Sequence, residues 1–212
     1  MQAANEQLSP EDQALNEAAA AVEAGNGARA LEICKALAEQ GNATAQYNLG
    51  VLYERAAGVT PDLRQAVRWY QLAADQGNPM AQYNLGVMYD LGRGVPQDNE
   101  QAMLWLGRAA SSGNASAQTN LGVMYDNGQG VERNVEKAAQ LFQLAAVQGN
   151  PVAQCNLASM YFYGVGVEQN FEQALTLYVQ AAEQGNEAAI AKVAEIVAAI
   201  DADAEQAPQV PA

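Results

Sequence analysis

A repeat of 36 residues constrains this sequence more than any other feature. A motif that begins with Ala-Gln recurs four times at this period without insertion or deletion, and its copies start at Ala45, Ala81, Ala117 and Ala153. The same register holds a Gly-Asn pair, which starts at Gly41, Gly77, Gly113, Gly149 and Gly185. A fixed period of this length is typical of solenoids, in which each repeat is one structural unit that packs on its neighbours.

Each repeat predicts two helices. Asn78 before Pro79 fits an N-cap followed by proline at the first helical position, and Gly77 suits the left-handed residue that ends the preceding helix. A second helix is predicted to begin after one polar register, which holds Asp62, Asp98, Asn134 and Asn170. Glutamines three residues further on predict capping boxes, at Gln65, Gln101 and Gln173.

Large apolar residues are spaced three and four apart on both helices. Leu49 and Tyr53 represent the first helix, and Trp69 and Tyr70 represent the second. Such spacing predicts apolar helix faces, and a single hairpin cannot bury both of its sides. Hairpins must therefore stack, so the predicted fold is all-α: a right-handed α-solenoid of about 11 helices.

The repeat divides the chain into five segments. We expect a flexible N-terminus, a degenerate helical hairpin that caps the N-terminal end, four repeats, a C-terminal capping helix and a disordered tail. In that order, their bounds are 1–9, 10–42, 43–186, 187–200 and 201–212.

Composition excludes several classes of function. The formal net charge is -14 and the ten basic residues are scattered, which argues against nucleic-acid binding. The sequence contains no run of about eighteen apolar residues, so we predict no membrane insertion. The chain has no histidine, and its two cysteines, Cys34 and Cys155, are far apart. We therefore predict no metal, no cofactor and no enzymatic activity.

The repeat motif resembles a known family. It can be written Ala-x-Ala-Gln-Tyr-Asn-Leu-Gly-Val-Met-Tyr-Asp-x-Gly-x-Gly-Val, and it closes with Ala-Ala-x-Gln-Gly-Asn. Over about residues 41–190 this pattern is similar to the Sel-one-like repeat (SLR), a relative of the tetratricopeptide repeat. The resemblance implies a bacterial scaffold or adaptor that holds a partner protein or peptide in its concave groove.

In the tetratricopeptide fold the first helix of each hairpin lines that groove, so the resemblance implies three rows of partner-binding residues. The first row is Tyr47, Tyr83, Thr119 and Cys155. The second row is Val51, Val87, Val123 and Ser159. The third row is Glu54, Asp90, Asp126 and Phe162. We expect a monomer whose partner offers basic and apolar side chains.

Two registers of the first helix have alternative interpretations. The acidic row lies in the last helical turn, where the helix dipole disfavours a carboxylate. These carboxylates either accept loop N–H groups and pair with an arginine such as Arg55 or Arg93, or form a charge stripe for a partner. The second register is Asn48, Asn84, Asn120 and Asn156. Its amides either hold the backbone of a bound peptide or satisfy backbone groups between repeats.

Three functions are consistent with the sequence. The leading one is a protein-interaction scaffold, and the alternative is an immunity protein that neutralises a secreted toxin. The third is an enzyme or small-molecule binder that acts on cell-wall material, which requires a pocket. The start, Met1-Gln2-Ala3-Ala4-Asn5, lacks a signal peptide but also fits a mature terminus behind an initiator Met. We favour the bacterial periplasm or cell envelope over the cytoplasm.

Overall fold

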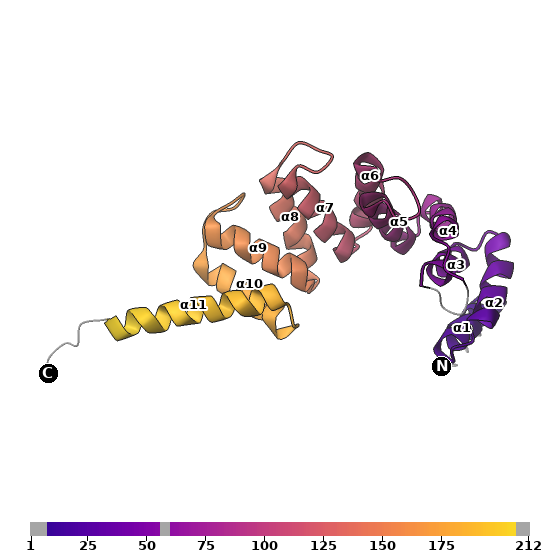
Figure 1. Cartoon of the computed structure of the whole chain (residues 1–212), viewed down its shortest axis with the longest axis horizontal. Coiled ribbons are helices and arrows are strands. Elements are labelled where there is room, and N and C mark those ends of the chain that lie inside the picture. The colour runs from indigo at the N-terminus through magenta and orange to yellow at the C-terminus, as the bar shows by residue number, and fades with distance from the viewer. Residues whose placement is uncertain (1–7, 56–59, 207–212) are drawn as a thin grey trace, which may run out of the picture. The chain divides into compact units, whose positions relative to one another are not determined.

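The computed structural model describes residues 8–55 and 60–206, and within these ranges it contains eleven α-helices and no strand (Figure 1). The chain forms two compact units, Met1–Ser112 and Gly113–Ala212, which we call unit 1 and unit 2. The helices of unit 1 are α1 (Pro10–Glu23), α2 (Gly27–Glu39), α3 (Ala43–Arg55), α4 (Leu63–Asp75), α5 (Pro79–Leu91) and α6 (Asn99–Ser111). Those of unit 2 are α7 (Ala115–Asn127), α8 (Val135–Val147), α9 (Pro151–Tyr163), α10 (Phe171–Glu183) and α11 (Glu187–Gln206).

The four repeats follow one plan. Their first helices are α3, α5, α7 and α9, and each packs against the second helix of its own repeat: α4, α6, α8 and α10 respectively. Small residues permit this close packing, because a Cβ placed on Gly86 would lie 2.7 Å from Leu106 Cγ. The prediction of an all-α repeat solenoid is confirmed.

The helix boundaries arise from the caps that the sequence predicts. Asn78 Oδ1 accepts a hydrogen bond from Ala81 N at 3.0 Å, Pro79 begins α5, and Gly77 has a φ of 87°. Before α6, Asp98 Oδ1 accepts from the backbone N–H groups of Glu100 and Gln101, both at 3.0 Å. The left-handed glycine and the polar cap together let one helix stop and the next begin within a few residues.

The predicted capping boxes are wrong. A capping box needs the glutamine side chain to bond the backbone N–H of the N-cap residue. That N–H instead donates to the carbonyl of a first-helix tyrosine, as in Asp98 N to Tyr89 O at 3.0 Å and Asn170 N to Tyr161 O at 2.9 Å. The hairpin loop therefore closes on the first helix, and the glutamine side chain is not needed at this donor.

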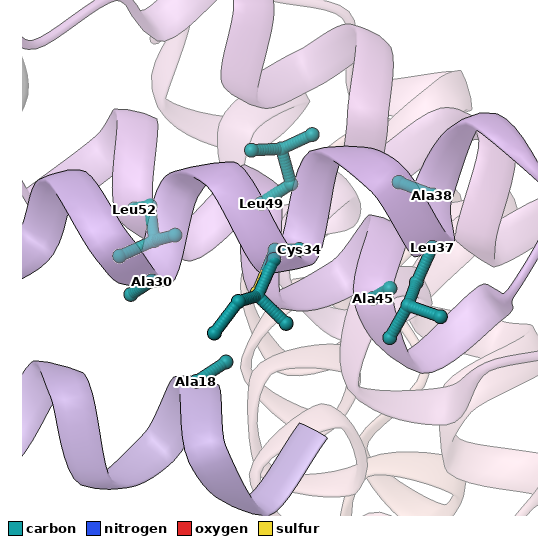
Figure 2. Packing of buried hydrophobic residues seen from close by; sticks show 9 residues of the cluster. Ala18, Ala30, Cys34, Leu37, Ala38, Ala45, Leu49 and Leu52 are labelled. Carbon is teal, nitrogen blue, oxygen red and sulfur yellow. The ribbon is translucent and has the colours of Figure 1, made fainter. Parts of the chain in front are cut away.

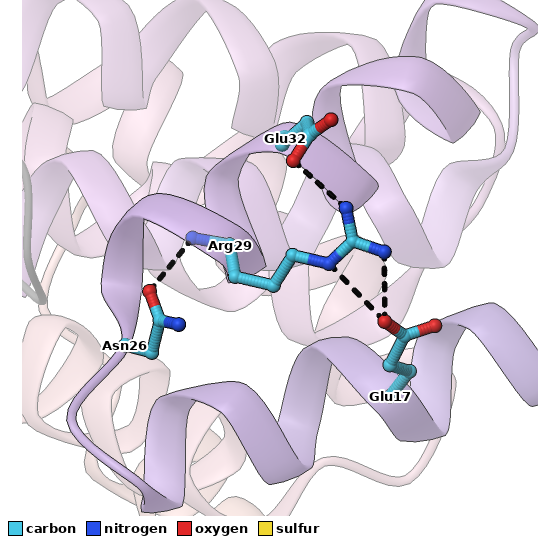
Figure 3. A network of polar contacts seen from close by, with 4 residues as sticks. All are labelled: Glu17, Asn26, Arg29 and Glu32. Carbon is cyan, nitrogen blue, oxygen red and sulfur yellow. Dashed lines mark hydrogen bonds and ion pairs between the residues drawn. The ribbon is translucent and has the colours of Figure 1, made fainter.

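The N-terminal hairpin of α1 and α2 packs on α3 through small side chains. Ala18, Cys34 and Leu52 come from the three helices and lie in one buried cluster (Figure 2). Arg29 joins the two helices at the surface, since its guanidinium contacts Glu17 at 2.9 Å and Glu32 at 2.8 Å (Figure 3). These ion pairs are exposed, so the apolar cluster contributes most of the stability here.

The two ends differ slightly from the predicted segments. Ser9 Oγ accepts from Asp12 N at 3.1 Å and so caps α1, while residues 1–7 lie outside the described residues. At the other end α11 runs to Gln206, past residue 200, where the sequence predicts a tail. Alanine and glutamate favour helix, and the first proline in this stretch is Pro208. The rest of the predicted tail, 207–212, also lies outside the described residues.

Candidate partner-binding site

In unit 1 the carboxylate of Glu54 has two protein partners. The Tyr70 hydroxyl donates to Glu54 Oε2 at 2.7 Å, and Arg93 Nη1 lies 3.0 Å from Glu54 Oε1. Burial, reinforced by the hydrogen bond to Glu54, raises the pKa of Tyr70 well above its usual range. The Glu54 side chain is 18% exposed. Of the two interpretations of the acidic row, pairing within the protein describes this position.

The other predicted residues of unit 1 are half-buried. Tyr47 and Val51 on α3 pack against the cluster that contains Tyr70, and the Tyr47 and Tyr70 ring centroids are 5.9 Å apart. On α5 the half-buried set is Tyr83, Val87 and Asp90. These positions combine packing within the repeat with partial exposure, which leaves room for a partner contact.

In unit 2 a cavity of about 450 Å³ brings together three predicted residues, Val123, Asp126 and Ser159. They come from α7 and α9, the first helices of two consecutive repeats. The remaining lining residues are Asn127, Arg133, Phe142, Asn156, Met160, Tyr163 and Val165. The cavity therefore joins polar groups at two first helices to an apolar and aromatic wall.

The polar groups of this cavity differ in their pairing. Arg133 Nη2 lies 3.3 Å from Asp126 Oδ1, and Arg133 Nε donates to the Asp126 carbonyl at 2.6 Å. The Asp126 side chain remains 38% exposed. Asn156 is half-buried, and among the described residues its side-chain amide has no hydrogen-bond partner. A bound molecule could therefore reach a carboxylate and an unpaired amide in the same concavity.

Ser159, Cys155 and Thr119 are partly or fully buried. Ser159 Oγ lies 2.8 Å from the Tyr178 hydroxyl, and burial raises the pKa of Tyr178. Burial also raises the pKa of the Cys155 thiol. Thr119 is 4% exposed and its hydroxyl donates to Ala115 O at 2.8 Å, so it presents almost no surface.

Phe162 breaks the acidic row and belongs to an aromatic cluster. Its ring meets Tyr163 and Phe171 edge-on, with centroids 5.0 Å and 5.3 Å away. Lys192 Nζ of α11 lies 5.0 Å from the centre of the Phe162 ring. The predicted third row is thus acidic in three repeats and aromatic in the fourth.

The recurring asparagines do not share one environment. Asn84 lies close enough to the Tyr70 hydroxyl to oppose the rise of its pKa, which places this asparagine beside the core of unit 1. Asn48 instead lines a cavity of about 320 Å³ together with Cys34, Val51 and Arg55, beside the cluster of Figure 2. Asn156 lines the cavity between α7 and α9. The register therefore serves packing at one position and faces a cavity at two others.

Sequence reasoning missed a buried glutamine in every repeat. Gln46 Nε2 donates to the carbonyl of Ala38 in the preceding helix at 3.2 Å, and its Oε1 accepts from Gln76 Nε2 at 2.7 Å. Gln154 repeats this in unit 2 with Ala146 at 3.4 Å and Gln184 at 2.8 Å. The signal was present, since a polar residue that recurs among alanines of an apolar face needs a buried partner.

The second repeat lacks one of these bonds. Ser112 stands where the other repeats carry the second glutamine: Gln76, Gln148 and Gln184. Gln82 Nε2 still donates to Ala74 O at 3.2 Å, but Gln82 Oε1 is buried and has no partner in the described part of the chain. Of the buried glutamines, Gln82 therefore has the least complete hydrogen bonding.

Within residues 8–55 and 60–206, no three histidine, cysteine, aspartate or glutamate side chains are grouped so that they could share a metal ion. In the same described ranges, none of the helices has the length and apolar character needed to span a bilayer.

Paired helices that recur every 36 residues and pack on one another define an all-α repeat solenoid. The chain belongs to the Sel1 repeat family, whose model matches residues 43–78, 79–114, 115–150 and 151–186, so the resemblance seen in the sequence is confirmed. Sel1 repeat proteins are generally protein-interaction scaffolds. Among curated proteins, none matches this sequence.

Solved structures extend the comparison. A protective antigen of uropathogenic Escherichia coli strains with an SLR fold is 35% identical, with a TM-score of 0.81, over 88% of this chain and 41% of that one. This chain thus spans less than half of that protein. A Sel1 repeat protein from Oxalobacter formigenes is 30% identical, with a TM-score of 0.81, over 88% of this chain and 78% of the other. An immunity protein from Pseudomonas aeruginosa is 30% identical, with a TM-score of 0.56, over 86% and 69%.

Proposed function

We propose that this chain is a non-catalytic interaction module that holds a partner protein or peptide on the surface of its first helices. The cavity between α7 and α9 is its principal contact in unit 2. One observation carries the proposal: the carboxylate of Asp126, which remains 38% exposed beside Arg133, and the unpaired amide of Asn156 share a concavity with an apolar wall. The family's general role as interaction scaffolds supports it.

The lining indicates the chemistry of the partner. A lysine or arginine side chain can lay its aliphatic stem on Phe142 and Met160 while its charged head reaches Asp126. The Asn156 amide can both donate to and accept from the peptide group next to that side chain. The net charge of -14 also favours a basic partner, because complementary charge accelerates association.

Three charge-matched variants test the proposal. Partners are captured from lysate and from periplasmic extract with the wild-type chain, with Asp126→Lys/Asn156→Ala and with Asp126→Lys alone, and are identified by mass spectrometry. Glu183→Lys is the control, because it makes the same change of charge at an exposed residue outside the cavity. We expect a partner that binds the wild type and the control but not the double variant. Equal capture by all four proteins would reject the cavity as the contact.

The structural likeness to the Pseudomonas aeruginosa immunity protein favours a second candidate, in which this chain is a dedicated inhibitor. An inhibitor predicts one cognate ligand with a basic surface, and a scaffold predicts several weaker partners. Titration of each captured protein by calorimetry separates them: a single partner bound with a Kd on the order of nanomolar supports the inhibitor. Several partners with Kd values near micromolar support the scaffold.

A further inference from the structure

A second concavity lies on the second-helix side of unit 2 and contains none of the predicted groove residues. Its volume is about 710 Å³, and it lies between α8 and α10 with α9 as its floor. The α8 wall carries Gln143 and Val147, and the floor carries Leu157 and Tyr161. The α10 wall carries Glu172, Gln173, Thr176, Leu177 and Gln180. We call this concavity the glutamine groove.

A change at one register explains why the groove is open. Leu177 occupies the register of Trp105, and Gln180 that of Arg108. In unit 1 the Trp105 indole is 4% exposed, packs in the cluster that contains Leu85, and has the Arg108 guanidinium 4.5 Å above its ring. Leu85 corresponds to Leu157 in the groove floor. The smaller leucine at position 177 therefore leaves open the space that an indole fills in the second repeat.

The groove is nearly uncharged in a strongly acidic chain. Among the described residues that line it, Glu172 is the one charged side chain. The exposed amides of Gln143 and Gln173 face the groove from opposite walls and have no hydrogen-bond partner in the described structure. Each amide can donate and accept, while Leu157 and Leu177 offer apolar surface between the walls. A ligand for this site is therefore uncharged, rich in donors and acceptors at its edges, and apolar on its faces.

We propose that the glutamine groove binds an uncharged oligosaccharide. A pyranose ring has hydroxyl groups around its edge and C–H groups on its faces, so its edges can bond to the Gln143 and Gln173 amides while a face lies on the floor. The volume is within the range of ordinary ligand sites. This binding is independent of the proposed protein partner, which contacts a different helix surface and different chemistry.

The experiment titrates the isotope-labelled full chain with cellotetraose and with chitotetraose and follows backbone and side-chain amide signals by NMR. We expect one or both sugars to shift the side-chain signals of Gln143 and Gln173. Leu177→Trp, which copies the residue of the second repeat, should weaken binding by about tenfold or more because the indole fills the groove. Circular dichroism checks that this variant is folded.

A matched pair of double variants keeps the test decisive even if Leu177→Trp does not fold. Gln143→Ala/Gln173→Ala removes both free amides and should weaken binding by about tenfold. Gln71→Ala/Gln101→Ala changes the same two registers in unit 1 and should leave the affinity unchanged. The proposal is overturned if neither sugar shifts the groove signals, or if both double variants bind equally well. Shifts caused instead by an uncharged Gly-Ser peptide, with none from the sugars, would also overturn it and assign the groove to polypeptide.

Discussion

Tyr70 in unit 1 and Tyr178 in unit 2 occupy the same register of the second helix, and both are buried, yet their hydroxyls bond to different groups. Tyr70 donates to Glu54 at 2.7 Å, whereas Tyr178 bonds to Ser159 at 2.8 Å. In unit 1 the position that matches Ser159 is Val51, and in unit 2 the position that matches Glu54 is Phe162. Neither residue carries a polar side-chain group. The first and fourth repeats thus each supply a partner for this tyrosine at one of two first-helix positions and an apolar residue at the other.

The first helix itself accounts for the difference. A Cβ added to Gly50 would lie 2.6 Å from the Tyr70 ring, and Ala158 carries that Cβ in the fourth repeat. The Tyr178 ring therefore cannot lie against α9 as Tyr70 lies against α3. In the second and third repeats Leu106 and Phe142 take the tyrosine register and have no hydroxyl to satisfy. The buried hydroxyl, where present, determines which first-helix residue is structural, and in the third repeat Asp126 has no such hydroxyl to accept from.

Placing the alanine of position 158 at the matching position 50 of unit 1 should have the largest effect on stability. Gly50→Ala is expected to destabilise unit 1 by about 2 kcal/mol, because the Tyr70 ring must move from a packed core. Urea unfolding followed by circular dichroism measures the change. The triple variant Gly50→Ala/Val51→Ser/Glu54→Phe copies the fourth repeat and should recover at least half of the loss. A loss as large in the triple variant as in the single one would contradict our account.

Removing the acceptor of Tyr70 should have the next largest effect. Glu54→Leu leaves a buried hydroxyl without its carboxylate, which costs about 1.5 kcal/mol. Glu54→Leu/Tyr70→Phe removes both partners and should be close to the wild type in urea unfolding. Asp126→Leu, at the same register opposite Phe142, is the control and should cost about 0.5 kcal/mol. If the control cost as much as Glu54→Leu, the tyrosine would not be the cause.

Alkaline pH tests both tyrosines together. Each has a pKa raised by burial, so the unfolded chain loses the phenolic proton near pH 10 while the folded chain retains it. Stability is therefore fully present below about pH 10 and falls as the pH rises above it, by about 1.4 kcal/mol per pH unit for one such group. Urea unfolding between pH 9 and 11 should show a smaller slope for Tyr70→Phe and for Tyr178→Phe than for the wild type. An unchanged slope in both variants would contradict the assignment.

The smallest expected effect concerns the buried glutamines, because a buried polar group needs a hydrogen-bond partner there as well. Ser112→Gln supplies the missing donor for Gln82 Oε1 and should stabilise unit 1 by about 1 kcal/mol. Ser112→Ala is the control, because it cannot donate to this oxygen. Thermal and urea unfolding measure both variants, and equal stability of the two would show that Gln82 Oε1 already has a partner, such as water.

Most of the fold could be predicted from the sequence because its signals are local and repeated. Gly77, Asn78 and Pro79 each specify a backbone conformation, and the same pattern recurs in register along the chain. The capping boxes failed because the donor they would use bonds to a tyrosine carbonyl from another helix, which no local motif reveals. Local rules therefore determined the helices but not the contacts between them.

The candidate site was less predictable for the same reason. Val123, Asp126 and Ser159 were assigned to the groove and do share a cavity, since equal registers of neighbouring hairpins lie close together. Thr119 shares its register with Tyr47 but is buried, and Glu54 is held by a tyrosine sixteen residues away. Register predicts where a residue lies on a helix, whereas its exposure depends on the size of the side chains opposite.

The glutamine bonds have a consequence for how such a chain can change over evolutionary time. Gln82 reaches back to one carbonyl of the repeat before it, Ala74 O, and Gln46 does the same with Ala38 O. Because the group offered at each of these junctions is the same, a gene duplication that inserted a whole repeat between residues 78 and 79 would find its donor and acceptor already in place. An insertion whose length is not a multiple of the 36-residue period would put a different backbone group opposite the glutamine. The hydrogen bonds between repeats are therefore preserved only by insertions or deletions of a whole number of repeats.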